Sequence, residues 1–271
     1  MTLPEEDNVS GKVPDSGSDP LETIATPGQA PSPARESRKL PDLLQVCRAL
    51  LEIILCSGLL TGLNAVLLLR WSGVPDHSIL TQSRYLALLG GLEAVQVLFL
   101  IGIFLRWNRQ SLVLLTGNFR RWRQEALLGL SLVPLLLGSN LLLGFLFEQY
   151  FPPWHSETNP ILELVRTPGD LALFLFIGLA VGGIKEEVQR AFILQRFRDD
   201  LAIPGFGLVA WSLLFGYGHL LQGVDSATGA TLFGLIFGFC FLWRKNLIAS
   251  MIAHCLYNSF ILIGYWYWGW A

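Results

Sequence analysis

Long apolar segments constrain the fold of this chain more than any other feature of its sequence. Seven of them follow residue 42, and each is close to the about 20 residues that an α-helix needs to cross a bilayer. Only 15% of the residues are charged, too few to cover the surface of a soluble domain of this length. The sequence therefore predicts an all-α polytopic transmembrane helix bundle with about seven spans. The predicted spans are residues 43–69, 84–106, 124–147, 169–197, 204–222, 226–243 and 246–268.

The first 42 residues differ in kind from the rest. They hold seven of the fourteen prolines, interspersed with Ser, Gly, Asp and Glu. Such a composition cannot bury enough apolar surface to offset the entropy of ordering, and the segment lacks the apolar core of a signal peptide. We expect residues 1–42 to be a disordered cytoplasmic tail, followed by N-terminal transmembrane helices and loops at 43–168 and a separate transmembrane core at 169–268.

The basic residues predict the orientation of the spans. Counted over the segment ends, thirteen lysines and arginines fall on the side of the N-terminus and three on the other side. Because basic loops stay in the cytoplasm, this asymmetry places the N-terminus there.

The pattern suits a multi-pass protein of a bacterial inner (plasma) membrane, or of the endoplasmic reticulum if the source is eukaryotic. The net charge of −2 indicates no nucleic-acid partner, so the lipid bilayer is the expected environment.

A cluster of charge lies inside the fourth predicted span. Glu186, Glu187 and Arg190 belong to it, within a long and mostly apolar stretch. An ionisable group at the centre of a membrane helix costs about 2.5–3.5 kcal/mol on insertion scales. The arginine lies four and three residues after the two carboxylates, so on a helix it can pair with either of them. A pair of adjacent carboxylates in this position indicates a functional site.

Two histidines occur in later spans with a companion residue at helical spacing. His219 follows Phe215 by four residues, and His254 precedes Asn258 by four residues. At 1.5 Å per residue, Glu186, His219 and His254 lie about 18, 21 and 12 Å from the cytoplasmic ends of their spans. We therefore predict that one cavity, open to the cytoplasm, contains all three.

Glutamate with two histidines can activate water for hydrolysis, but two other functions use the same residue types. A proton-coupled transporter relays protons through intramembrane Glu and His. Against it, the two halves of the chain show no repeat of this pattern, which many transporters have. A non-catalytic membrane immunity or scaffold protein with the same fold is the third possibility. In a purely structural role, the Glu–Arg pair would only clamp two helices together.

The three motifs, in this order on separate helices, resemble those of the intramembrane CAAX-protease and bacteriocin-processing (CPBP) family, which includes the type II CAAX prenyl endopeptidases. That family shows Glu-Glu…Arg, then Phe-x-x-x-His, then His-x-x-x-Asn. Residues 215–219 and 254–258 match the last two motifs. The first departs, because the family usually has three residues between the second Glu and the Arg and this chain has two. The resemblance covers residues 170–260.

The resemblance implies an intramembrane endopeptidase, with two versions of the mechanism. In one, Glu186 is the general base for a water that His219 holds, His254 and Asn258 stabilise the oxyanion, and Glu187 is oriented by Arg190. In the other, Zn or another divalent metal is bound by Glu186, His219 and His254, and Glu187 is the base. The sequence does not choose between them. The implied partner is a peptide or membrane-protein substrate, whether prenylated or not.

Other charged residues are expected to be structural. Glu52 lies four residues after Arg48 and is predicted to pair with it. Glu93 lies well inside the second span and is interpreted as structural. His77 and His155 fall in loops and are predicted to have no part in the site. The four cysteines show no paired metal-ligand spacing.

Overall fold

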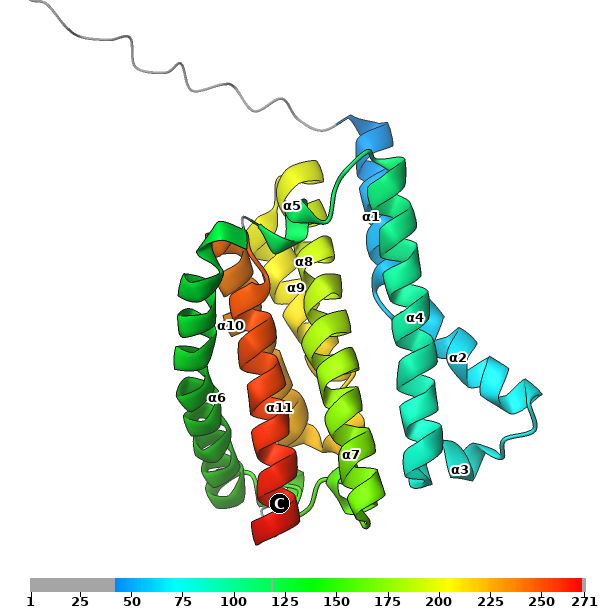
Figure 1. The fold of residues 1–271 in the computed structure, drawn as a ribbon, viewed down its shortest axis with the longest axis vertical. Coiled ribbons are helices and arrows are strands. Elements are labelled where there is room, and N and C mark those ends of the chain that lie inside the picture. Colours follow the sequence, from blue (N-terminus) through cyan, green and yellow to red (C-terminus); the bar gives the residue numbers. More distant parts are fainter. Residues whose placement is uncertain (1–41, 118, 270–271) are drawn as a thin grey trace, which may run out of the picture. The chain divides into compact units, whose positions relative to one another are not determined.

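The computed structural model describes residues 42–117 and 119–269, and every regular element among them is a helix. Figure 1 shows the long helices running alongside one another. The all-α prediction is thus confirmed for this part of the chain. The predicted tail lies outside it except for Asp42, whose carboxylate caps the first helix by accepting a hydrogen bond from the Gln45 backbone N–H at 2.6 Å.

The N-terminal helices form a bent segment followed by a long helix. Helix α1 (Leu43–Cys56) is followed by α2 (Leu59–Trp71), and Gly58 between them has a φ of +89°. Glycine adopts this left-handed conformation without a clash from a Cβ atom. The short α3 (Asp76–Thr81) connects α2 to α4 (Ser83–Trp107), which contacts both α1 and α2 (Figure 1).

A second long helix, α6 (Trp122–Tyr150), contacts α10 and α11 and buries little of its surface. Only 11% of its most apolar stretch is buried, and of its leucines only Leu136 is fully buried. The short α5 (Val113–Thr116) and the 3₁₀ turn η1 (Phe119–Arg121) lead into it. The loop that follows contains two further 3₁₀ turns, η2 (Pro152–Trp154) and η3 (Leu162–Leu164).

The fourth predicted span is helical throughout but changes its winding. It runs through α7 (Pro168–Ile177), the π-helical η4 (Gly178–Glu186), α8 (Glu187–Gln195) and the π-helical η5 (Arg196–Asp200). A capping box at Thr167 fixes its start. π-Helical turns are rare and occur frequently at functional sites. The charged motif lies at the junction of η4 and α8.

The C-terminal part consists of three helices. They are α9 (Pro204–Tyr217), α10 (Val224–Arg244) and α11 (Ile248–Trp268), with the 3₁₀ turn η6 (Leu220–Gln222) after α9. The fifth predicted span, 204–222, is therefore not one helix, because the α-helix ends at Tyr217 and Gly218 forms its C-cap.

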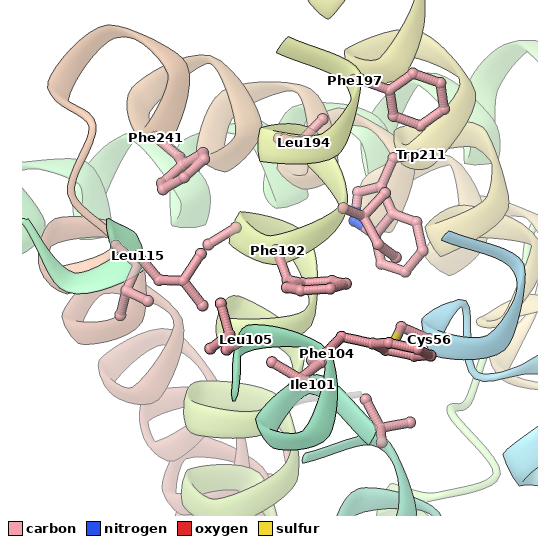
Figure 2. Packing of buried hydrophobic residues seen from close by; sticks show 14 residues of the cluster. Cys56, Ile101, Phe104, Leu105, Leu115, Phe192, Leu194, Phe197, Trp211 and Phe241 are labelled. Carbon is pink, nitrogen blue, oxygen red and sulfur yellow. The ribbon is translucent and has the colours of Figure 1, made fainter. Parts of the chain in front are cut away.

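Buried apolar side chains hold α8 between its neighbours. Figure 2 shows Phe192 and Leu194 of α8 lying among residues of α4, α9 and α10. The ring centroids of Phe192 and Phe104 are 6.5 Å apart in a stacked arrangement. Because α8 packs against helices from both the N-terminal and the C-terminal part of the chain, both parts determine how α8 is oriented. The cluster includes Cys56, Ile101, Phe104, Leu105, Leu115, Phe192, Leu194, Phe197, Trp211 and Phe241.

Within the described residues, five helical segments are long and apolar enough to cross a membrane. They coincide with predicted spans one, two, three, six and seven, while α9 is a shorter apolar helix. Large apolar side chains also lie exposed along α1, α2, α4 and α6, as lipid-facing surfaces require. The protein is therefore a multi-pass membrane protein, and the count of seven spans with a cytoplasmic N-terminus stays a prediction.

Candidate functional site

The candidate site is built from α8, α9, α10 and α11, and its most buried part is an ion pair on α8. Glu187 and Arg190 are both 1% exposed, and the guanidinium Nη1 donates to Glu187 Oε1. Of the two carboxylates that sequence spacing allowed, the arginine thus pairs with Glu187. The two-residue interval places Arg190 three positions later, which suffices for this contact.

Two phenylalanine rings surround the arginine. The guanidinium carbon of Arg190 lies 4.6 Å from the ring centroid of Phe215 on α9 and 5.3 Å from that of Phe237 on α10. A cation over an aromatic face is stabilised by the ring quadrupole, more so when water is excluded. This arrangement holds the positive charge beside Glu187 and away from lipid.

His254 on α11 completes this buried group. Its Nδ1 lies 2.8 Å from Glu187 Oε1, and its ring centroid lies 5.3 Å from that of Phe237. Because a carboxylate accepts, Nδ1 is the protonated nitrogen, and the ring orientation directs Nε2 away from Glu187. Glu187 therefore fixes both the tautomer and the orientation of His254.

Glu186 is the more accessible of the two carboxylates. Its side chain is 17% exposed, against 1% for Glu187, and its Oε2 lies 3.9 Å from His254 Nε2. This separation is beyond direct hydrogen-bond distance. Two adjacent carboxylates thus occupy different environments.

Gly182, one turn before Glu186, lets the polar groups of α11 approach the backbone of η4. A Cβ atom at this position would lie 2.5 Å from Asn258 Nδ2 and 3.5 Å from His254 Nε2. The Asn258 amide also donates to the Gly178 carbonyl at 3.5 Å, the limit of a hydrogen bond. The amide nitrogen of Asn258 and the Nε2 of His254 therefore face the same short stretch of backbone next to Glu186.

His219 lies at the edge of this group rather than at its centre. It follows the end of α9, and its Nδ1 donates to the Phe215 carbonyl at 2.8 Å. Its ring centroid lies 4.6 Å from that of Phe215, which in turn lies 6.4 Å from that of His254. Phe215 thus touches both histidine rings as well as Arg190.

The turn that carries His219 is held by the loop before α7. Asp225, at the start of α10, accepts hydrogen bonds from the Ser156 backbone N–H and pairs with His155 Nδ1, each at 3.0 Å. Asn159 donates to Gln222 at 3.2 Å. His155, expected to be uninvolved, therefore helps to shape the surroundings of His219 without belonging to the group itself.

The proposed metal ligands do not converge. In residues 42–117 and 119–269 no group of three His, Cys, Asp or Glu side chains is placed to hold one metal ion. Glu186 and His254 lie 3.9 Å apart, whereas the contacts of His219 are with Phe215. As arranged, the residues do not fit a Zn site made by these three side chains.

Two members of the group were missed by sequence reasoning. Phe237 has no chemical signature that separates it from the other apolar residues of α10. Gly182 belongs to the pair Gly182-Gly183, and small residues in a membrane helix indicate close approach of a neighbouring helix. The glycine pair therefore predicted close helix packing at this position. Only the position of α11 shows that the side chains packed against Gly182 are those of Asn258 and His254.

The predicted structural ion pairs are present with additional partners. Arg48 and Glu52 lie 3.8 Å apart, but Glu52 is closer to Arg196, at 2.6 Å. Glu93 pairs with the buried Lys185 at 2.5 Å. Ion pairs between distant segments thus add to the local Arg48–Glu52 pair. A charge buried in a membrane needs an opposite charge close by, because no water is there to stabilise it.

Comparison with known families gives one match. Residues 168–260, which contain all the residues of the candidate site, match the family described as type II CAAX prenyl endopeptidase Rce1-like. No curated protein and no solved structure matches the chain. The motifs singled out in the sequence all fall inside the matched range. Over residues 168–260, the chain is therefore similar to the type II CAAX prenyl endopeptidase Rce1-like family.

Proposed function

We propose that this protein hydrolyses a peptide bond of a membrane-associated substrate with a water molecule activated by Glu186. The observation that carries the proposal is the unequal environment of the two carboxylates: Glu187 is buried in an ion pair, whereas Glu186 is 17% exposed and lies 3.9 Å from His254 Nε2. The family match supports peptide hydrolysis as the reaction class.

The chemical step assigns a separate task to each side chain. Glu186 accepts a proton from water as the water oxygen attacks the carbonyl carbon of the scissile bond. The negative charge then on the carbonyl oxygen is stabilised by the Asn258 amide and by the His254 imidazole. The intermediate collapses with cleavage of the C–N bond, and Glu186 passes its proton to the departing amine nitrogen.

Glu187 and Arg190 act through His254. In neutral His254 the proton lies on Nδ1, toward Glu187, so Nε2 can accept a proton. Nε2 takes up a proton from bulk water before the attack, and the carboxylate of Glu187 stabilises the imidazolium, which donates from Nε2 to the oxyanion and keeps its proton when the intermediate collapses. Arg190 is the counter-ion of Glu187 in an apolar environment. His219 is the proposed holder of the attacking water, through the Nε2 that its bond to Phe215 leaves available.

The direct test is cleavage by the purified protein in proteoliposomes, with products identified by mass spectrometry. The substrate panel contains a farnesylated CAAX-type peptide, the same peptide without the lipid, and a leader-type peptide. We expect cleavage of at least one of them at a single bond. A protein that is folded and cleaves none of the panel while moving protons across the liposome membrane would contradict the proposal and favour transport.

The metal-dependent version makes a different prediction. It requires His219 to approach Glu186 and His254, and the purified protein would then contain about one equivalent of divalent metal. Metal analysis together with cleavage in the presence of a chelator distinguishes the two versions. We expect the cleavage rate to be unchanged by the chelator, whereas a loss that Zn restores would assign the metal-bound mechanism instead.

A further inference from the structure

The continuous helical stretch formed by η4, α8 and η5 presents a second polar face, distinct from the one that bears the candidate site. Lys185, Gln189 and Arg196 recur at intervals of four and seven residues, which places them on one side of a helix. All three are nearly buried, with exposures of 6, 3 and 1%. Glu186, Glu187 and Arg190 occupy a different face, so the two polar groups of the helix serve different neighbours.

Each member of this second face contacts the N-terminal helices. Lys185 Nζ lies 2.5 Å from Glu93 Oε2 on α4. Gln189 donates to the Cys56 carbonyl at 2.6 Å, where α1 ends, and Arg196 pairs with Glu52 of α1 at 2.6 Å. The glutamate partners lie outside residues 168–260, so these contacts connect the family-matched region to the rest of the chain.

The bend between α1 and α2, at Gly58, packs closely against Glu93 and Gln189. A Cβ atom on Gly58 would lie 2.9 Å from Glu93 Oε1 and 3.2 Å from Gln189 Nε2. The end of α1 leaves the Cys56 carbonyl without a helical partner, and Gln189 supplies the missing donor. The bend therefore brings a backbone acceptor and a carboxylate against one turn of the site-bearing helix.

We propose that the Lys185–Glu93 ion pair positions Glu186 by fixing the rotation of η4 and α8. The inference rests on the proposed function of Glu186. Lys185 directly precedes Glu186 at the end of the π-helical stretch, where the winding of the helix changes. An anchor on one side of this turn sets the direction in which the next side chain points. Lys185 and Glu93 are thus positioning residues, which act through Glu186.

The decisive variant is the double substitution Glu93→Leu/Lys185→Leu. Replacing both members of a buried ion pair by apolar residues often leaves stability unchanged or increases it, whereas removing one member leaves an unpaired charge. If the pair positions Glu186, we expect kcat to fall roughly tenfold to a hundredfold with KM nearly unchanged, because small misplacements of catalytic groups have effects of this size. The exchanged pair Glu93→Lys/Lys185→Glu is expected to recover most of the lost kcat.

A matched control separates positioning from general stability. Glu125 on α6 pairs with Arg244 on α10 at 2.5 Å and is 2% exposed, but neither residue contacts α8 through this pair. Glu125→Leu/Arg244→Leu therefore removes a comparable pair elsewhere in the bundle. We expect it to leave kcat at the wild-type value. Wild-type kcat in the Glu93→Leu/Lys185→Leu protein would overturn the proposal.

A second measurement needs no activity. A Cβ atom on Gly183 would lie 3.4 Å from the Cβ of Cys255, close to the about 3.5–4.5 Å found in disulfides, and 2.0 Å from its Sγ, which must rotate away to form the bond. In a Gly183→Cys protein whose other three cysteines are alanine, the rate of cross-linking to Cys255 reports how η4 faces α11. We expect the leucine pair at 93 and 185 to slow cross-linking, the exchanged pair to restore it, and the leucine pair at 125 and 244 to have no effect.

The two measurements distinguish the possible failures. If the wild-type protein cleaves no substrate but cross-linking responds as expected, the proposed function fails and the positioning of η4 stands. If cleavage occurs and neither kcat nor cross-linking responds to the leucine pair at 93 and 185, the proposed function stands and the positioning role is wrong.

Discussion

The two adjacent glutamates at the junction of η4 and α8 are the sharpest contrast in the molecule. Glu187 is 1% exposed and contacts both Arg190 and His254, whereas Glu186 is 17% exposed and lies 3.9 Å from His254. One carboxylate is held by partners on its own helix and on α11. The other is more exposed and makes no direct hydrogen bond with His254. The comparison teaches that two adjacent carboxylates in a membrane protein can lie in very different environments.

Loss of the buried carboxylate should have the largest effect on stability. Glu187→Gln leaves the buried Arg190 without its counter-ion, and breaking such a pair costs about 3–5 kcal/mol. We expect this loss in SDS-induced unfolding of the purified protein, together with loss of cleavage. The exposed loop residue Glu157 provides the control, since Glu157→Gln should change neither property. If Glu187→Gln is as stable as the wild-type protein, Glu187 does not stabilise the fold and the proposed difference between the two carboxylates is wrong.

Asn258→Ala tests the open half of the site. Removal of a single oxyanion donor lowers kcat about 10²–10³-fold, and we expect a loss of this size with little change in KM. Because the bond to the Gly178 carbonyl is long, unfolding should be nearly unaffected. Asn64→Ala, which removes an amide bonded to Gln96 at 2.8 Å between α2 and α4, is the matched control. Equal kcat values for the two variants would contradict the assignment.

Gly182→Ala tests how closely α11 must approach η4. The added methyl group would lie 2.5 Å from Asn258 Nδ2 and must displace it. We expect kcat to fall about tenfold or more, since the geometry around the reacting atoms is disturbed. Gly91→Ala on α4, where nothing lies within 4 Å of the added atom, should retain wild-type kinetics. If the two alanines behave alike, the close approach at Gly182 has no functional importance.

The smallest effect is expected for Arg190→Lys. Lysine keeps the charge beside Glu187 but loses the planar contact with Phe215 and Phe237. We expect a stability loss of about 1–2 kcal/mol, the size of a desolvated cation–π contact. Arg123→Lys, next to the exposed Trp122, should cost less than half as much. A lysine variant that unfolds as readily as Glu187→Gln would show that the rings matter as much as the charge.

Much of the fold was predictable because a bilayer leaves few options. Apolar length identified the helices, and the cost of intramembrane charge singled out Glu186, Glu187 and Arg190. Spacing also allowed the ion pair on α8, although it did not decide which carboxylate takes part. His219 was predicted to lie in a continuous helix, yet α9 ends at Tyr217.

The remaining features depend on contacts between segments far apart in the sequence. Periodicity along one helix does not reveal that Lys185 faces Glu93 or that Arg196 reaches Glu52. Nor does it show that Gly182 admits Asn258. Such contacts follow from the packing of α8 between the N-terminal helices and α11, which no local pattern specifies.

The most direct test of the proposed division between the carboxylates is a comparison of Glu186→Gln with the wild-type protein in the same proteoliposomes, measuring kcat and the unfolding midpoint together. Removal of a general base lowers rates about 10²–10⁴-fold. Glu186 bears no buried counter-ion contact, so we expect kcat to fall at least about a hundredfold while the unfolding midpoint stays at the wild-type value. Wild-type kcat in Glu186→Gln, or a loss of activity that merely follows a loss of stability, would contradict the assignment of Glu186 as the base.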